Sequence, residues 1–258
     1  MRIYLHLLII LLVLVSWHSW AWALDHDNLD QNRPLQIEDA YPIAKGEIGI
    51  EDGVLYRNLK QGSSHWEPHL QILYGAFYNT QIGIGGNLVK ELTPTDETKQ
   101  FWNLNLEGLY NFNTETLTIP ALALKLELEF PTGENSGRID TTLGGLLTRT
   151  WGRVRTHLNL EYTFIGSAQT GERNGAYRVL WGVNYPLGYP MRFRETLIGD
   201  IFARQSEKNG EDNIAGIELG LRHQLSPRVV LDGGIGTEFS GPSDRSRILG
   251  TVGLSVGF

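Results

Sequence analysis

The chain has 258 residues, no cysteine and a formal net charge of −7 at pH 7. The acidic balance argues against a nucleic-acid partner, and the lack of cysteine excludes a disulfide framework and a thiolate metal site. No apolar run of about 18 residues follows residue 23, so any membrane contact beyond that point must come from strands.

The first residues carry the features of an export signal. Arg2 precedes an apolar run over residues 7–15, and the small residues Ala21 and Ala23 follow it. The run is shorter than the roughly 20 residues that a membrane-spanning helix needs, and small residues at this spacing are typical of a cleavage site. We therefore predict a signal peptide over residues 1–23 that is cleaved after Ala23, in preference to an uncleaved membrane anchor.

Residues 24–44 are polar, contain prolines and show no strand pattern. A stretch of this kind on the periplasmic side is more often a flexible lead-in to the domain that follows. It could also fold back into that domain as a plug. The sequence leaves both interpretations open and favours the lead-in.

Residues 45–258 alternate repeatedly between apolar and polar side chains. In residues 121–130, leucine or phenylalanine occupies the even positions, while alanine, lysine and glutamate occupy the odd ones. A period of two is that of a strand, because a helix would distribute the leucines around its circumference. The pattern predicts about twelve strands, near residues 45–57, 66–77, 80–91, 102–112, 121–130, 139–151, 153–164, 176–185, 191–204, 213–224, 228–239 and 247–258.

The predicted connections alternate between tight turns and longer polar loops, as in outer-membrane barrels with short periplasmic turns. An even number of strands places both ends of the barrel on the periplasmic side. The tight turns are predicted near residues 78–79, 113–114, 152, 186–189 and 226–227. Aromatic residues near strand ends match the interfacial girdles of such barrels; they are Tyr110, Phe112, Tyr162, Phe164 and Tyr185.

The last predicted strand has apolar residues at every second position and ends in Phe258. This ending resembles the signature by which the outer-membrane assembly machinery recognises its substrates. We predict an all-β fold, a transmembrane antiparallel up-and-down β-barrel in contact with outer-membrane lipid. A soluble β protein with its apolar faces turned inward is the alternative.

Two charged residues conflict with the alternation. Asp52 and Glu195 fall on the predicted lipid face, where a charge is unfavourable. A bulge near Gly53, or a position at the membrane interface, is expected to accommodate them.

A local motif lies at the junction KLELEFPTGENSG, residues 125–137. Its residues close a strand and open an extracellular loop, and an aspartate and a glycine pair follow. They are Phe130, Pro131, Thr132, Gly133, Asp140, Gly144 and Gly145. Together with the layout of the whole chain, the motif resembles a bacterial family of transporter-like outer-membrane barrels named for a meta pathway of phenol degradation. The resemblance implies transport, with phenol as only one of the solutes that it would allow.

The polar positions of the strands would line the lumen and carry charges of both signs. Such a lining can filter small solutes by size and field, although facing charges can also pair and fill a narrow interior. We expect a narrow path. The candidate lumen-lining residues are Lys125, Glu127, Glu129, Arg153, Arg155, His157, Glu161, Arg178, Glu218, Arg222 and Asp232.

The sequence thus predicts a passive channel for small solutes, aromatic or hydrophobic ones included, without a cofactor, metal or catalytic residue. A non-conducting structural or surface-binding barrel is the alternative. A lipid-modifying barrel enzyme is a third hypothesis, for which His157 is the best candidate base, although no serine stands at the matching position. His65 and His69 lack a nearby third ligand, so we predict no metal site there.

Overall fold

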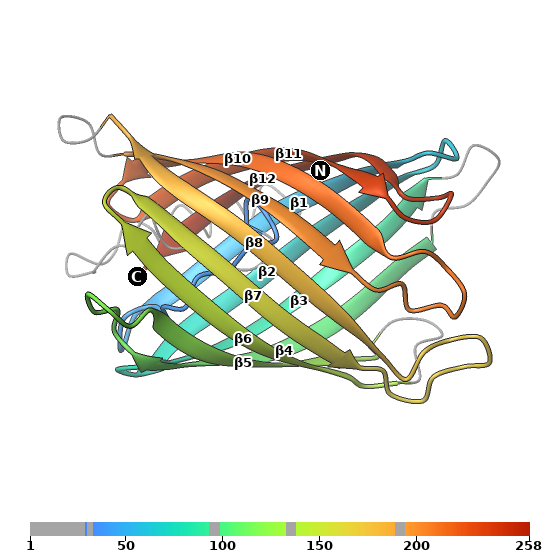
Figure 1. Cartoon of the computed structure of the whole chain (residues 1–258), viewed down its shortest axis with the longest axis horizontal. Coiled ribbons are helices and arrows are strands. Elements are labelled where there is room, and N and C mark those ends of the chain that lie inside the picture. Colours follow the sequence, from blue (N-terminus) through green and yellow to red (C-terminus); the bar gives the residue numbers. More distant parts are fainter. Residues whose placement is uncertain (1–28, 30–32, 93–98, 133–137, 189–193) are drawn as a thin grey trace, which may run out of the picture.

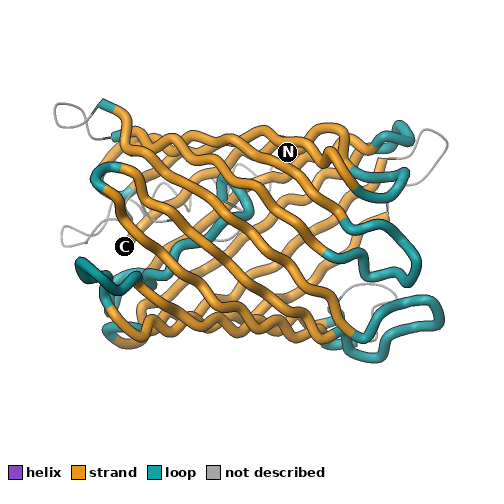
Figure 2. Tube along the Cα trace, in the orientation of Figure 1, coloured by secondary structure: helices purple, strands orange, loops and turns teal. Residues whose placement is uncertain are grey.

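A computed structural model describes residue 29 and residues 33–92, 99–132, 138–188 and 194–258. These residues form a closed barrel in which consecutive strands pair antiparallel and β1 pairs with β12 (Figures 1 and 2). The predicted signal peptide lies outside the described residues. No helix in the described part of the chain is long and apolar enough to cross a membrane. The strands are β1 (Ile48–Leu59), β2 (Ser64–Phe77), β3 (Thr80–Leu92), β4 (Lys99–Asn113), β5 (Ala121–Phe130), β6 (Asp140–Trp151), β7 (Val154–Phe164), β8 (Gly175–Leu187), β9 (Glu195–Arg204), β10 (Ile214–Ser226), β11 (Val229–Ser240) and β12 (Ser246–Gly257).

The apolar face of each strand points out of the barrel. In β5, Leu124 and Leu126 are exposed, while the intervening Lys125 is 1% exposed. Leucines that point outward are favourable in the hydrocarbon of a membrane. In a barrel surrounded by water, they would point inward instead. The predicted barrel is therefore confirmed, and the soluble alternative with inward apolar faces is wrong.

Both ends of the barrel wall meet at the same rim. The backbone N–H of Ile48 donates to the carbonyl of Phe258 at 3.0 Å, and that of Phe258 donates back to Ile48 at 2.8 Å. Two predicted turns at this rim are longer than expected. The turn predicted near residues 186–189 is a connection over residues 188–194, because β8 extends to Leu187 and β9 begins at Glu195. The connection between β4 and β5 covers residues 114–120, because Pro120 has no N–H to give to the ladder and β5 begins only after it.

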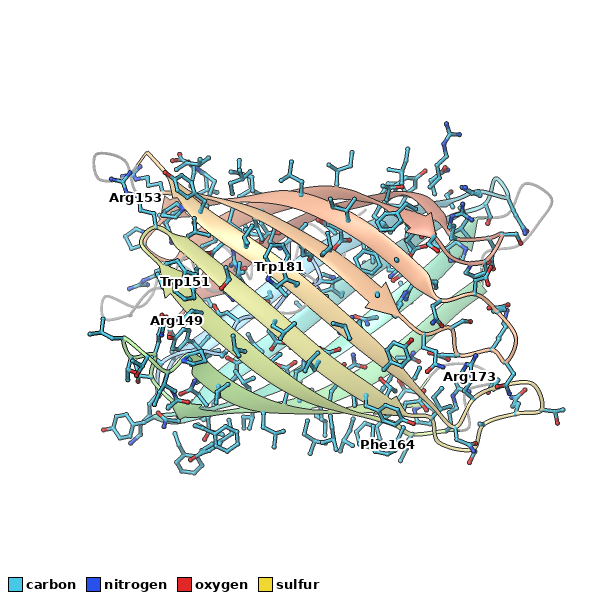
Figure 3. All side chains as sticks on the ribbon, viewed as in Figure 1. Arg149, Trp151, Arg153, Phe164, Arg173 and Trp181 are labelled. Carbon is cyan, nitrogen blue, oxygen red and sulfur yellow. The ribbon has the colours of Figure 1, made fainter. Side chains whose placement is uncertain are left out.

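Exposed aromatic side chains gather at both rims. Trp151 and Phe164 lie near opposite ends of the barrel (Figure 3), and they are 63% and 50% exposed. Tyr110, Phe112 and Tyr162 are exposed as well. Amphipathic rings at these two levels match the interfaces of a membrane.

Asp52 and Glu195, the two charged residues on the predicted lipid face, are accommodated in different ways. The β1 ladder runs without interruption through Gly53, so the expected bulge is wrong, and Asp52 faces outward between Leu70 and Leu254. Glu195 is the first residue of β9, and its Oε1 lies 3.0 Å from Nδ1 of His223. The interfacial explanation fits Glu195, because a charge costs less at the rim than at mid-membrane.

Candidate functional site

Part of the N-terminal region lies inside the barrel. Residues 33–44, which we call the inner segment, run through the interior along the wall (Figures 1 and 2). Arg33, Ile37 and Ala40 are at most 1% exposed. The structure therefore differs from the flexible lead-in that the sequence favours.

Arg33 anchors one end of the inner segment to the wall. Its Nη2 donates to Asp232 Oδ2 at 2.8 Å and to Ser255 Oγ at 3.2 Å, and its Nη1 donates to the backbone carbonyl of Asp52 at 2.7 Å. A guanidinium group offers donors in a fixed planar fork. The contacts join the segment to three strands, β1, β11 and β12.

Backbone groups of the inner segment find their partners on polar wall side chains. The N–H of Gln36 donates to Glu218 Oε2 at 3.1 Å, and that of Ile37 donates to Asp200 Oδ2 at 3.2 Å. Asp200 was not predicted as a lumen residue. An irregular segment has no ladder of its own, so its buried N–H groups need such acceptors.

The Ala40 backbone is held from both sides. Its N–H donates to Thr148 Oγ1 at 2.9 Å, and its carbonyl accepts from Asn111 Nδ2 at 2.7 Å. Further along, the N–H of Ile43 donates to Gln81 Oε1 at 2.9 Å. The sequence pattern marked these three wall residues only as polar positions of strands, and nothing local indicated their partner.

A buried ion pair connects the middle of the inner segment to β5. Lys125 Nζ lies 2.7 Å from Glu38 Oε2, and both side chains are almost completely buried. Taking either charge out of water is costly unless the other is present. The predicted lumen residue Lys125 is therefore committed to the inner segment.

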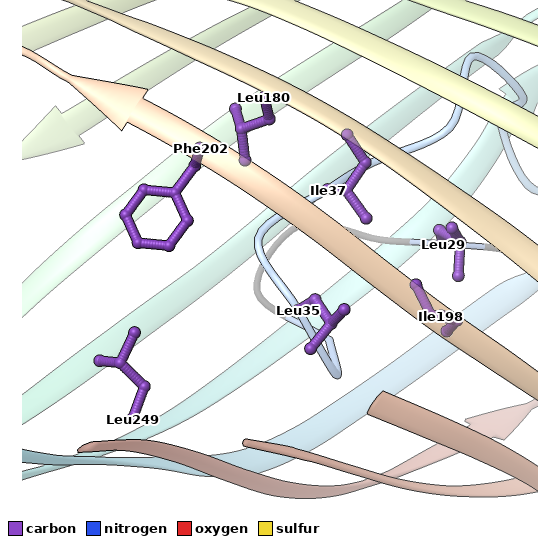
Figure 4. Close-up of a cluster of buried hydrophobic side chains, with 7 residues drawn as sticks. All are labelled: Leu29, Leu35, Ile37, Leu180, Ile198, Phe202 and Leu249. Atoms are coloured by element: carbon purple, nitrogen blue, oxygen red, sulfur yellow. The ribbon is translucent and has the colours of Figure 1, made fainter. Parts of the chain in front are cut away.

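Apolar contacts complete the docking of the inner segment (Figure 4). Its residues pack against inward-facing apolar residues of the wall, which a purely polar lumen would lack. A second group surrounds Ala40 and Tyr41. The first cluster consists of Leu29, Leu35, Ile37, Leu180, Ile198, Phe202 and Leu249.

Glycines on the inward face make room for the inner segment. A Cβ at Gly182 would lie 2.8 Å from Ile37 Cγ1, and one at Gly234 would lie 2.9 Å from the Pro34 carbonyl oxygen. At Gly250, which faces outward, a Cβ would meet nothing within 4 Å. Glycine lets another backbone approach closely, so these inward glycines serve the packing of the segment and not only strand curvature.

Most candidate lumen residues lie on inward strand faces, and the structure brings several together. Glu161 accepts from Arg178 Nε at 2.7 Å. Arg153 is the exception, because it lies in the exposed turn between β6 and β7 beside Gly152, whose φ is +66° (Figure 3). The inward residues are Lys125, Glu127, Glu129, Arg155, His157, Glu161, Arg178, Glu218, Arg222 and Asp232.

His157 lies inside the barrel and is fully buried. Its Nδ1 is 3.0 Å from Thr148 Oγ1, the same hydroxyl that accepts from the inner segment. A lipid-modifying enzyme would need its base on the lipid-facing surface. The position of His157 therefore favours a packing role.

A cavity of about 460 Å³ opens at the rim opposite the one where Ile48 and Phe258 meet. We call it the vestibule. It is formed by the ends of β5, β7 and β9 and by the beginnings of β6, β8 and β10. Its charged lining residues among those described are Glu127, Glu129, Asp140, Glu161, Arg178, Arg204 and Glu207.

Residues 45–247 match the family model described as "Putative MetA-pathway of phenol degradation". The chain belongs to this family. The family resemblance predicted from the strand-to-loop motif is therefore confirmed. The matched residues cover nearly the whole barrel wall of this family member, and the inner segment lies before them.

Solved structures similar to this family member include outer-membrane channels and porins. The COG4313 outer membrane channel from Pseudomonas putida F1 has a TM-score of 0.67 and 11% identity, with 85% of this chain and 98% of that chain covered. The KdgM porin has a TM-score of 0.57 and 9% identity over 81% and 99%. The NanC porin has a TM-score of 0.58 and 10% identity over 81% and 98%. At such identities the likeness shows the fold, and no curated protein matches the chain by sequence.

Proposed function

We propose that this protein is a passive outer-membrane channel for small solutes whose lumen is restricted by its own inner segment. The main support is the barrel interior, which combines a vestibule of about 460 Å³ with a segment held by side chains. A segment attached in this way can leave without breaking any strand pairing of the wall. The lumen can therefore change its width while the barrel stays closed.

Small aromatic solutes are the first class to test. The family description refers to phenol degradation, and the vestibule volume is within the range of small-molecule sites. Phenol is small enough to enter such a cavity. The proposed transport is diffusion and requires no cofactor.

The test is planar-bilayer conductance of the refolded mature chain and of a variant that lacks residues 24–44. We expect small or infrequent openings for the full mature chain and larger, steady currents for the variant, because the inner segment occupies the lumen. Phenol uptake into proteoliposomes should likewise be faster with the variant than with the full mature chain.

A non-conducting barrel is the second candidate, because the inner segment fills the interior with fully buried residues. Correctly folded protein that passes neither ions nor phenol, with or without residues 24–44, would favour it. Empty liposomes and heat-denatured protein serve as controls for leakage.

Export and assembly of the barrel each depend on a feature of the sequence. We infer that cleavage occurs after Ala23 and that Phe258 is the assembly signal for the outer-membrane machinery. N-terminal sequencing of the membrane protein tests the first inference. Deletion of Phe258, with measurement of the amount inserted, tests the second.

A further inference from the structure

The outer surface of the barrel wall has an apolar groove of about 620 Å³ that crosses β8 to β12. Exposed side chains of neighbouring strands border it, among them Trp181, Ile201, Leu219 and Ile235. Figure 3 shows Trp181 about midway between the two rims. The groove therefore opens toward the hydrocarbon of the membrane and not toward the lumen.

Gly199 lies on the floor of the groove. The strand register places it between Val183 on β8 and Leu219 on β10. A Cβ at Gly199 would lie 3.7 Å from Leu219 Cδ1, which is ordinary contact, so this position has room for a larger side chain. An acyl chain can take the same space. Association inside a membrane depends on such packing, because lipid tails are as apolar as leucine side chains.

The two acidic residues that contribute to the groove do not point into it. Asp200 and Glu218 accept hydrogen bonds inside the barrel, from the N–H groups of Ile37 and Gln36. Of the charged lining residues that the structure describes, Arg247 is therefore the one on the outer surface.

Arg247 is an exposed residue near the start of β12. Thr237 Oγ1 on β11 donates to its backbone carbonyl at 2.9 Å, which holds the residue beside the groove. Within the described part of the chain, no side chain forms an ion pair or a hydrogen bond with its guanidinium group. A guanidinium group presents paired donors that match the oxygens of a phosphate.

The Arg247 end of the groove lies at the extracellular rim. The connections at this rim, such as residues 165–174 and 205–213, are longer than the turns 78–79 and 152–153 at the other rim, as in outer-membrane barrels. Phe239, which is 61% exposed near the end of β11, marks the level of the membrane interface. A cation at this level meets the head groups of lipids in the outer leaflet.

We propose that the groove and Arg247 together bind one phosphorylated, acylated lipid of the outer leaflet, with an acyl chain packed over Gly199 and a phosphate held by Arg247. The groove selects for the chain, and the arginine selects for the negative head group. The inference goes beyond the proposed channel function, because the site lies on the outside of the wall and does not depend on what the lumen passes.

The first test is native mass spectrometry of the detergent-refolded mature chain, titrated with bis-phosphorylated lipid A and with the same lipid after removal of both phosphates. The phosphorylated form should bind at least about tenfold more tightly. Arg247→Gln should weaken its binding by about tenfold, because charge-assisted hydrogen bonds are lost. Gly199→Leu, which fills the floor of the groove, should weaken it by about fivefold through lost packing contacts.

Two matched variants serve as controls. Arg153→Gln removes the same charge from an exposed turn at the opposite rim. Gly145→Leu adds the same side chain at an exposed glycine of β6, where a Cβ would meet nothing within 4 Å. Both should bind lipid A like the parent. Equal binding of the two lipid forms, unchanged binding in either groove variant, or an equal loss in the controls overturns the site.

The second test measures the temperature at which the folded band of unboiled protein disappears from a denaturing gel. A ligand that binds only the folded state raises this temperature. Lipid A should raise it more for the parent than for Arg247→Gln or Gly199→Leu, and the presence of a folded band at low temperature shows that each variant has folded. The same rise in all three proteins would mean that the lipid acts only as a general solvent, which overturns the proposal.

Discussion

At the scale of single residues, the interior differs from a generic porin lining because several of its polar side chains bind the inner segment. Lys125 illustrates this. Its place on an alternating strand marks it as inward, but only the fold shows that Glu38 meets it at 2.7 Å. The same holds for Thr148, whose hydroxyl serves both Ala40 and His157.

The Glu38 and Lys125 pair should control docking of the inner segment. Either Glu38→Gln or Lys125→Met leaves a buried charge poorly compensated, at a cost of about 3 kcal/mol. Because the chain has no cysteine, Ala40→Cys can report on docking through its rate of maleimide labelling. Each single change should speed labelling at least about tenfold.

The double change Glu38→Gln/Lys125→Met is the control for that prediction. It removes both charges, so labelling should return toward the rate of the parent. Unchanged labelling in both single variants would show that the ion pair does not hold the segment.

The inward-facing glycines that leave room for the inner segment lead to a separate prediction. Gly234→Val would place side-chain atoms against the Pro34 carbonyl and the Leu35 side chain, so it should displace the inner segment and raise conductance. Gly250→Val on the neighbouring strand faces outward into open space and should leave conductance unchanged. If both variants behave like the parent, the glycines are not there to accommodate the segment.

At the scale of elements, the inner segment and the wall are separate structures in contact. The wall is held by its own closed ladder, whereas residues 33–44 depend on side chains of many strands. The segment is therefore expected to respond to conditions that leave the wall intact, pH among them.

Asp39 gives the inner segment a pH dependence. Burial raises the pKa of its carboxyl from the usual 3.8 to about 6, against the lowering effect of hydrogen bonds from the Tyr41 and Leu29 N–H groups. The docked state thus holds its proton more tightly than the released state, so docking strengthens as pH falls from about 6 toward about 4. Labelling of any thiol slows as its thiolate fraction falls with pH, so rates are divided by those of a free thiol at the same pH. The corrected labelling rate of Ala40→Cys should still fall across this interval.

Asp39→Asn isolates this contribution, since the amide does not titrate in the range. The slowing of labelling between about pH 6 and pH 4 should be smaller in the variant than in the parent. An identical pH profile in both proteins would mean that other groups govern the response.

At the scale of the whole molecule, closure is the dominant property. All the strands pair on both sides, and β1 and β12 join the ends. A closed barrel in a membrane has no unpaired edge to begin unfolding. The free energy of unfolding should therefore come mainly from strand pairing in the wall and depend little on the inner segment.

This closure predicts heat-modifiable migration on a denaturing gel. Unboiled protein from the outer-membrane fraction should run at a different position from boiled protein. The variant without residues 24–44 should show the same shift, because the wall keeps every pairing. An unshifted band, or recovery in the soluble periplasm, would be incompatible with the membrane barrel.

The sequence by itself determined the barrel wall, because strand alternation has a period of two that is written locally in residues such as those of β5. It also indicated which residues face inward, with Arg153 as an exception where the predicted strand began before its turn had ended. The family motif and the chain-end pattern are likewise local signals.

Only the tertiary structure decided what the lumen contains. The inner segment has no periodicity, because its backbone is satisfied by side chains far away in the sequence, such as Asp200 and Glu218. Gln36 and Glu218 are far apart in the sequence, so the residues around each give no sign that the two are partners. The charged lining of the vestibule also arises only when several strands end at one rim. Its carboxylates come from β5, β6, β7 and the segment after β9, and no single stretch of sequence carries more than two of them.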